Sequence, residues 1–377
     1  MFMDISSELI HSLLPIFMVS VLGSSMLTVG LVEGIAEAAA AITKVFSGAL
    51  SDRLRRRKTL LVFGYALAAC TKPVFPLAGS IGWIFAARFV DRIGKGIRGA
   101  PRDALVADLT LPAHRGAAYG LRQALDSVGA LLGPLLAIAC LAVFANDLRA
   151  AMWVGVLPAL VAVVVLTTYV QEPQHLRNQA QSTRVPLRLA HLPDLPLRFW
   201  LIVLLGAVFT LARFSEAFLV LRAQDLGLAL VAVPLVMVLM NLLYAVFAYP
   251  AGLAADHFKA RSLLLAGLLM LIGADALLAS AQALPAVFAG AALWGLHMAL
   301  TQGLLAKLVA DTAPETLRGT AFGLFNLVSG LALLLASVIA GALWQALGAS
   351  ASFVAGAGFA ALAALGLLLY RPPIQSR

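Results

Sequence analysis

Long apolar segments recur along almost the whole chain, and they constrain its fold more than any other feature. Each segment has roughly the 20 residues that an α-helix needs to cross a bilayer. Hydrophobic residues make up 62% of the 377 positions and charged residues 12%, which excludes an ordinary soluble domain. We therefore predict an all-α membrane protein with twelve transmembrane helices, at residues 8–25, 28–50, 59–79, 81–108, 116–144, 149–170, 198–223, 228–250, 262–282, 285–311, 317–344 and 348–370.

A polar stretch rich in proline and arginine, residues 171–197, interrupts this pattern near the middle of the chain. We predict that it forms a cytoplasmic linker between an N-terminal six-helix bundle, residues 1–170, and a C-terminal six-helix bundle, residues 198–377. The two bundles are expected to be pseudo-symmetric, because VADLTLPAHRGAAYGL at 106–121 aligns without gaps with VADTAPETLRGTAFGL at 309–324. Repeats of this kind place a substrate site between the halves, near the bilayer midplane.

The positive charges of the loops indicate how the chain lies in the membrane. Nearly all loop Lys and Arg residues fall on the side of the N-terminus, whereas the opposite side keeps Arg149 and Arg222. Because basic loops stay in the cytoplasm, both termini are predicted to be cytoplasmic, in a bacterial-type inner (plasma) membrane. The formal charge of +9 does not indicate nucleic-acid binding, because the basic residues lie in short turns between apolar segments.

Two sequence motifs resemble signatures of the major facilitator superfamily. GALSDRLRRRK at 48–58 resembles the family's loop between helices 2 and 3, although Arg55 replaces its usual glycine, and a degenerate copy lies near residue 256. The resemblance implies a cytoplasmic gate formed by Gly48, Asp52, Arg53, Arg56, Arg57, Asp256 and Arg261. The alternative is a charge cluster that only fixes orientation.

The second motif is in helix 5. Gly120, Gly129, Gly133 and Pro134 fit the pattern G-x8-G-x3-G-P, which the family associates with antiporters, although Ala137 and Ile138 replace the glycine pair that normally closes it. The alternative is simple close packing of helices. The resemblance to the family extends over the whole chain and implies alternating access between two helix bundles.

Ionisable residues within the predicted spans are the most informative feature. Each would cost roughly 2.5–3.5 kcal/mol or more if it faced lipid, so these faces are expected to turn inward. The candidates for substrate contact or proton coupling are Glu33, Glu37, Arg88, Asp91, Arg92, Lys95, Arg98, Arg122, Asp126, Arg213 and Glu216. Arg88 also resembles a buried arginine of the family.

Their depths along the helices suggest specific partners. We predict that Glu37 pairs with Arg88 or Arg92 and that Asp126 pairs with Lys95 or Arg98. Asp91 is expected to pair within its own helix. Glu37, Asp126 and Glu33 are candidate proton carriers; the alternative for each is a permanent ion pair of the scaffold. The excess of basic residues favours an anionic substrate.

These observations predict a secondary active transporter of a small solute, with proton-coupled efflux as the first hypothesis. The alternative is a proton-coupled uptake symporter of an organic anion such as a siderophore or carboxylate. We do not expect an enzyme, because HExxH, GxSxG and P-loop motifs are absent from the sequence. No cofactor, metal or nucleic acid is expected, and we expect a monomer whose coupling ion is the proton.

Overall fold

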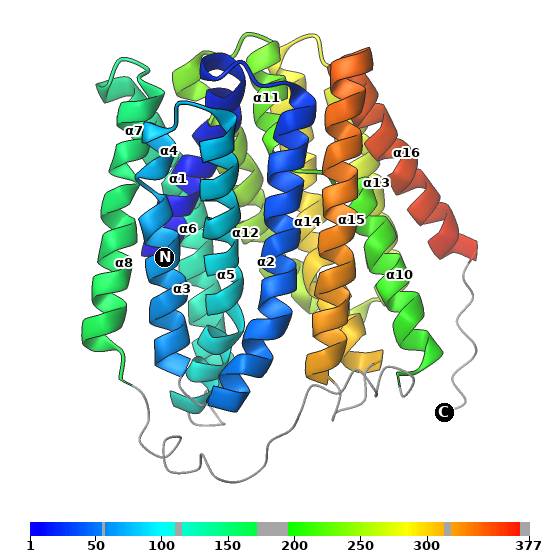
Figure 1. Cartoon of the computed structure of the whole chain (residues 1–377). Helices are drawn as coiled ribbons and strands as arrows, with labels where there is room; N and C mark the ends of the chain where they lie inside the picture. The colour runs from blue at the N-terminus through cyan, green and yellow to red at the C-terminus, as the bar shows by residue number, and fades with distance from the viewer. Residues whose placement is uncertain (55–56, 110–114, 172–194, 313–317, 370–377) are drawn as a thin grey trace.

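The computed structural model describes residues 1–54, 57–109, 115–171, 195–312 and 318–369, with the side chains of some residues near helix ends left out. The helices run side by side in one bundle (Figure 1). We call the end that holds Tyr169 and Leu197, drawn at the bottom of Figure 1, the linker end, and the other the short-loop end.

The described part of the first half contains eight α-helices and a π-helical turn. They are α1 (Phe2–Ile16), the turn η1 (Phe17–Val21), α2 (Met26–Leu54), α3 (Arg57–Thr71), α4 (Val74–Leu77), α5 (Ile81–Leu109), α6 (Arg115–Val143), α7 (Leu148–Val154) and α8 (Val156–Tyr169). The second half contains α10 (Leu197–Ala212), α11 (Ala217–Asp225), the 3₁₀ turn η4 (Leu230–Ala232), α12 (Leu235–His257), α13 (Ala260–Ser280), α14 (Leu284–Thr312), α15 (Arg318–Leu347) and α16 (Ala349–Leu369).

Most of these helices have the length and composition of membrane spans. Within the described chain, 11 helical segments are long and apolar enough to cross a membrane. The remaining long helix, α5, has 29 residues and runs alongside the others, but it is rich in charged residues (Figure 1). No strand occurs in the described residues. The predicted all-α membrane fold is therefore confirmed.

Several helices differ from the prediction, and the predicted helix 149–170 is among them, because it divides into α7 and α8. The first begins at Phe2 rather than near residue 8, and the third divides into α3 and the short α4. The predicted helix 198–223 is interrupted at residues 213–216, although these residues include neither glycine nor proline. Ser215 N donates to Ser337 Oγ at 3.2 Å there, so a contact with another helix replaces a helical hydrogen bond.

The turns at the short-loop end show why the chain can reverse direction in so few residues. The Asp147 side chain accepts from Arg149 N at 2.9 Å and Ala150 N at 3.2 Å, which caps the start of α7. Gly348 follows α15 with φ of +89°, a left-handed conformation that favours glycine. Its N–H donates to the Trp344 carbonyl at 2.9 Å and closes the helix end.

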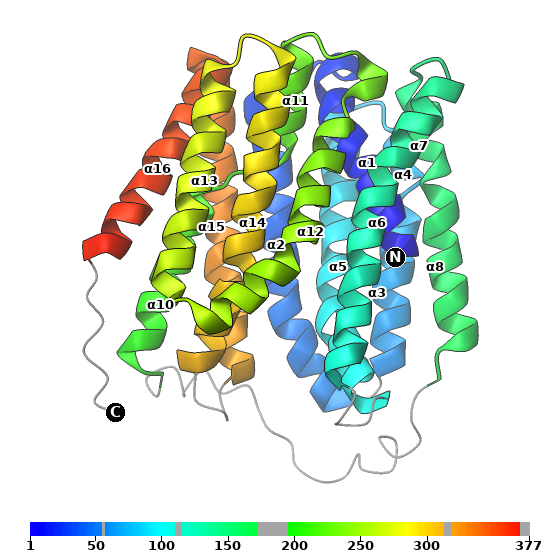
Figure 2. The same ribbon diagram turned by 180° about the vertical axis from the view of Figure 1, so that it is seen from behind.

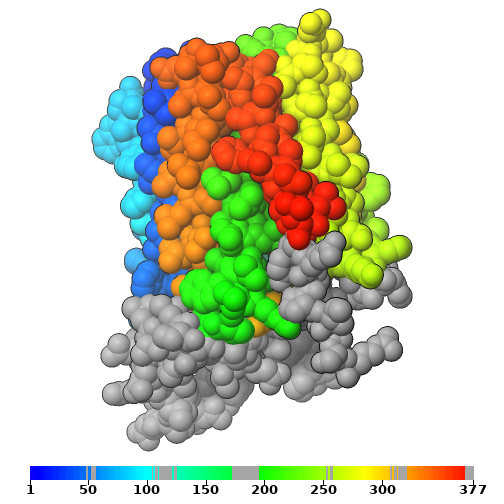
Figure 3. Space-filling model, turned by 90° about the vertical axis from the view of Figure 1, so that its right-hand side faces the viewer, coloured from blue at the N-terminus to red at the C-terminus, as the bar shows by residue number. Residues whose placement is uncertain are grey.

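Helices α2 and α15, from opposite halves, pack against each other along their length, and we call this contact the α2–α15 seam (Figures 1 and 3). Glycines make the close approach possible. A Cβ added at Gly34 would lie 2.8 Å from Leu334 Cδ1, and one at Gly341 would lie 2.5 Å from the Met26 carbonyl oxygen. The seam therefore holds the two halves in contact on one side of the molecule.

On the other side of the molecule, α6 packs against η4 and α12. Figure 2 shows the lower part of α12 turning away from α6 toward the linker end. α12 contains Pro250, and proline bends a helix because its ring removes a backbone hydrogen bond. The contact between the halves is thus less extensive here than at the α2–α15 seam.

Candidate functional site

The charged face of α5 points into the bundle. Arg88, Asp91, Arg92 and Arg98 are buried, with Arg88 only 2% exposed. Gly94 packs against α3 and Gly96 against α2, because a Cβ at either position would collide with the neighbouring helix. These contacts fix the rotation of α5. The prediction that these charges face inward is therefore consistent with the burial of four of them.

The centre of the site is a cluster of three residues from three helices: His11, Glu33 and Arg88. Arg88 Nη2 lies 2.7 Å from Glu33 Oε2 and 2.7 Å from His11 Nδ1. A guanidinium group can only donate, so His11 Nδ1 must accept, and the imidazole must be neutral. His11 and Glu33 therefore share one cation, and protonation of His11 would remove one of its two acceptors.

The next turn of α5 carries a second ion pair. Arg92 Nε lies 3.1 Å from Glu37 Oε1, so Glu37 pairs with one of its two predicted partners. The Glu37 side chain keeps 30% of its surface exposed, whereas Arg92 keeps 4%. Since Glu37 is reached by solvent inside the bundle, this pair borders an accessible interior.

Asp91 pairs with another helix, which corrects the prediction of a partner within α5. Lys72 Nζ lies 2.8 Å from Asp91 Oδ1 and donates to Ser7 Oγ at 3.0 Å. The exposed fractions of the two charged side chains are 2% and 4%. Lys72 precedes α4, so the break between α3 and α4 places its side chain beside α5. This pair is closed to solvent and belongs to the scaffold.

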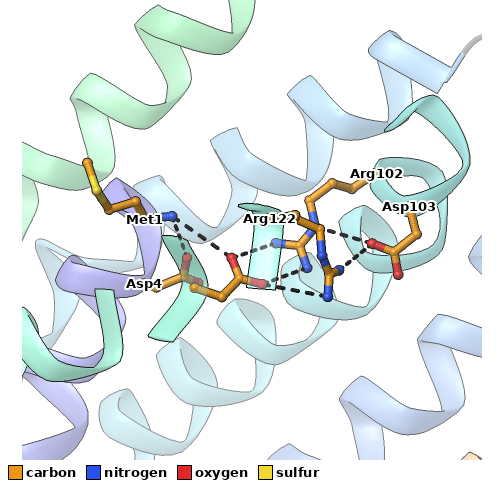
Figure 4. Close-up of polar contacts among 6 residues, drawn as sticks. Met1, Asp4, Arg102, Asp103 and Arg122 are labelled. Carbon is orange, nitrogen blue, oxygen red and sulfur yellow. Dashed lines mark hydrogen bonds and ion pairs between the residues drawn. The ribbon is translucent and has the colours of Figure 1, made fainter. Parts of the chain in front are cut away.

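Asp126 does not pair with Lys95 or Arg98, and that prediction was wrong. Its carboxylate lies 3.2 Å from Arg102 Nη2 and 3.9 Å from Arg122 Nη2. Figure 4 shows Arg102 and Arg122 close together and pointing toward Asp103. Arg122 also reaches Asp103 Oδ1 at 2.5 Å. The charges near the linker end of α5 and α6 thus form a network of their own, away from Glu37.

Three further predicted cations, Lys95, Arg98 and Arg213, have no ion pair among the described residues, and the Arg98 guanidinium lies over the Tyr65 ring, 4.7 Å from its centroid. Lys95 is exposed, and Arg213 from the interruption between α10 and α11 is half-buried. Within the described residues, no carboxylate lies within ion-pair distance of either one. Arg213 and Glu216, which lie three residues apart in the predicted helix 198–223, do not form an ion pair, because the segment 213–216 is not helical. Glu216 lies within the electrostatic reach of Arg213 and of Glu8, Glu37 and Lys95 of the first half.

The sequence reasoning missed the acidic and histidine residues of the first helix. Asp4, Glu8 and His11 have the spacing i, i+4, i+7, which places them on one face of α1. That spacing was the signal that could have revealed them. Gly129 and Gly133 of α6 face α1, and a Cβ at these positions would lie 2.8 Å and 2.6 Å from the Cβ atoms of Asp4 and Glu8.

The other predicted residues are only partly described. The surroundings of Gly48, Asp52, Arg53, Gly120 and Asp256, and all of Arg56, lie outside the described part of the chain, so the cytoplasmic gate stays a prediction. Arg57 begins α3 and is half-buried, and Arg261 donates to the Leu368 carbonyl. Pro134 lies inside α6. The structure shows close packing at Gly129 and Gly133 and leaves an antiporter role untested.

Helical spans with paired charges at mid-depth, arranged in two contacting halves, define a polytopic membrane transporter. The chain belongs to the Major Facilitator Superfamily, whose family model matches residues 1–222 and 203–377. A transporter of this superfamily from Methanocaldococcus jannaschii, itself uncharacterized, is 33% identical over 353 residues, which is 91% of this chain and 85% of the relative.

Two further similarities concern part of the chain or the fold alone. The multidrug resistance protein MdtH of Edwardsiella ictaluri is 30% identical over 146 residues, 39% of this chain and 35% of that protein. The crystal structure of a mutant of the nucleoside transporter NupG superposes with a TM-score of 0.81 over 97% of both chains, at 12% identity. At that identity the likeness shows the fold.

Proposed function

We propose that this transporter exports a small solute with an anionic group in exchange for protons. The observation that carries the proposal is the sharing of Arg88 by His11 and Glu33 in the interior. A proton on His11 would add a second positive charge next to Arg88 and bring Glu33, whose Oε2 is 3.9 Å from His11 Nδ1, into an ion pair with the imidazolium. Arg88 would then be free to change partner, so proton binding and conformation are linked.

The unpaired cations support the anionic character of the solute. Lys95 and Arg213 come from different halves, and Glu216 lies within the electrostatic reach of both, so in this proposal an anion bound near Glu216 contacts both cations. Two cations from opposite halves could hold an anion only while the halves are close together. A solute with a carboxylate or phosphate group would therefore favour the closed interior and promote the change of state.

The export direction rests on two weaker supports. One is the helix-5 pattern with Gly129 and Gly133, and the other is the partial match to proteins named for multidrug resistance. The excess of cations equally favours uptake of an organic anion together with protons, which is the second candidate. We also propose that the linker end faces the cytoplasm of a bacterial-type inner (plasma) membrane, because the basic loops gather there, and that the protein works as a monomer.

Reconstitution in proteoliposomes tests the proposal. With a solute identified by thermal-shift screening of organic anions, a pH jump across the vesicle membrane should drive solute movement opposite to the proton flux. Movement in the same direction would establish uptake instead. Solute movement that ignores the pH jump would refute proton coupling in both forms.

Variants of the cluster sharpen this test. His11→Gln and Glu33→Gln should strongly reduce the response to the pH jump while solute exchange without a gradient continues. The loss expected is about 5–150-fold, the usual range of coupling between two bound ligands. His297→Gln is the matched control, because His297 is a buried histidine of the second half whose Nδ1 lies 2.8 Å from the Gly267 carbonyl oxygen. Equal losses in His297→Gln would refute the role of His11.

A further inference from the structure

A buried carboxyl group in the second half has no part in the charged site described above. Asp275 lies in α13 and its exposed fraction is 0%. Neither carboxyl oxygen has a hydrogen-bond partner among the described residues. Every other buried carboxylate of the described chain, namely Glu33 and Asp91, has a cation within 3 Å.

The surroundings of Asp275 are apolar and tightly packed. A Cβ added at Gly356 of α16 would lie 2.7 Å from Asp275 Oδ2 and 3.0 Å from Phe214 Cε1. Gly356 therefore provides the space in which the carboxyl group and the Phe214 ring meet. The Phe214 ring packs edge-on against Trp294, with the centroids 5.4 Å apart.

Among the residues whose side chains are described, Arg222 and His297 on the neighbouring elements have other partners. Arg222 of α11 binds Asp225 and the carbonyls of Leu278 and Ala281 at the short-loop end of α13. His297 of α14 binds the Gly267 carbonyl. α16 contains no ionisable residue.

Arg213 and Glu216 are the remaining charges, and they flank Phe214 in the interrupted segment 213–216. Phe214 thus meets Asp275 beside Gly356 and directly follows Arg213 in the chain. A small cavity of about 10 Å³ lies beside Gly356 and Phe214, and Ser352 also lines it. That is about the space that one water molecule needs.

An ionised carboxylate is not stable in such a place. Removing a carboxylate from water without a partner costs several kcal/mol even after the protein relaxes, and buried charges are normally paired. The neutral acid costs far less, although it still leaves its O–H and carbonyl groups unpartnered. The geometry accordingly favours a carboxyl group that carries a proton in the conformation seen here.

From this arrangement we infer that Asp275 is a second proton-binding site of the transporter, loaded in this conformation and emptied when the segment 213–216 rearranges. The proton would bind to a carboxyl oxygen of Asp275. Movement of Phe214 would open the carboxyl group to water and to Arg213, where the carboxylate becomes stable and the proton leaves to water. The interruption of α10 and α11 would then link proton release in the second half to the interior that holds the solute.

Infrared spectroscopy of protein labelled with ¹³C at the aspartate carboxyl carbons tests proton binding without a transport assay. At pH 7, Asp275→Asn should lack one protonated ¹³C carboxyl stretch that the wild type shows. Asp225→Asn is the matched control, because its carboxylate lies 2.6 Å from Arg222 and its loss should remove an ionised band. If Asp275→Asn is not recovered folded, Asp275→Glu in the same labelled background should also lose the aspartate band. If the difference spectrum between the wild type and Asp275→Asn contains no protonated ¹³C carboxyl band, the inference is overturned.

A second measurement tests release of the proton during transport and rests on the proposed proton coupling. The number of protons moved per solute in proteoliposomes should fall in Asp275→Asn and stay unchanged in Asp225→Asn. An unchanged ratio in Asp275→Asn would overturn the transport role. If the wild type moves no protons at all, the proposed coupling fails, and the infrared result alone decides whether Asp275 binds a proton.

Discussion

The buried pair between Lys72 and Asp91 allows a sharp test of which intramembrane charges are scaffold. At 2.8 Å the two charges attract each other by about 6 kcal/mol, taking an effective dielectric constant of about 20. Asp91→Asn would leave the Lys72 ammonium buried beside a neutral amide, with Ser7 as its remaining partner. Breaking a buried pair in this way costs about 3–5 kcal/mol.

Thermal unfolding of the purified protein in detergent measures this cost. Taking about 2 °C per kcal/mol for a large domain, Asp91→Asn should lower the Tm by roughly 6–10 °C. The double variant Lys72→Met with Asp91→Leu should recover most of the loss, because it removes both charges and keeps the volume.

A pair with one exposed partner provides the control. Glu37→Gln also removes a carboxylate that pairs with an α5 arginine, but the Glu37 side chain is 30% exposed. Solvent reaches the Glu37 end of this pair and hydrates the glutamine amide, whereas Arg92 stays buried, so we expect a loss smaller than that of Asp91→Asn. A Tm for Asp91→Asn that equals that of Glu37→Gln would refute the distinction between scaffold and accessible charges.

Three further changes test other parts of the structure. Gly94→Ala should lower the Tm, because its Cβ would lie 2.7 Å from the Gly64 carbonyl oxygen and force α3 and α5 apart. The expected loss of stability is about 1–3 kcal/mol. An unchanged Tm would contradict this packing. Lys95→Gln should weaken binding of carboxylate ligands in a thermal-shift titration while leaving the Tm without ligand unchanged, and equal binding would argue against an anion site. Arg222→Gln should lower the free energy of unfolding by denaturant by about 2 kcal/mol, because two carbonyl groups at the end of α13 lose a charged donor. An unchanged free energy of unfolding would show that water replaces this donor.

The membrane fold and the inward direction of the charges could be predicted from the sequence because both follow from solvation. A long apolar segment is more stable in lipid than in water, whereas a charged side chain within it is more stable away from lipid. The burial of Arg88 and Glu33 could therefore be predicted without knowing which helices surround them. The pairing of Glu37 with Arg92 was among the predicted options because both residues lie at a similar depth.

The wrongly predicted partners of Asp126 and Asp91 show that depth along a helix does not determine which helices face each other. Asp126 and Lys95 were predicted to lie at the same height, but height does not tell which helix faces which. The rotation of α5 is set by Gly94 and Gly96, whose contacts with α3 and α2 are known only in three dimensions. Asp91 pairs with Lys72 for the same reason, because packing on α3 turns it away from its helix neighbours.

The interruption at residues 213–216 could not be predicted because its cause is a tertiary contact. The sequence Arg-Phe-Ser-Glu contains no residue that breaks a helix. The hydrogen bond from Ser215 N to Ser337 Oγ compensates one lost helical bond, and the two residues are 122 positions apart. Asp275 was passed over in the same way, since a lone acid in an apolar helix has no local pattern.

The α2–α15 seam has a mechanical consequence. Carbonyl oxygens, glycines and small side chains meet across it too closely to slide without collision, so it should behave as a pivot. Rocking about this pivot would widen or narrow the opposite side, where α12 bends at Pro250, far more than the seam itself. Pairs of spin labels across α2 and α15 should then report nearly constant separations in every state, whereas pairs across the linker-end halves of α6 and α12 should report two distinct distances.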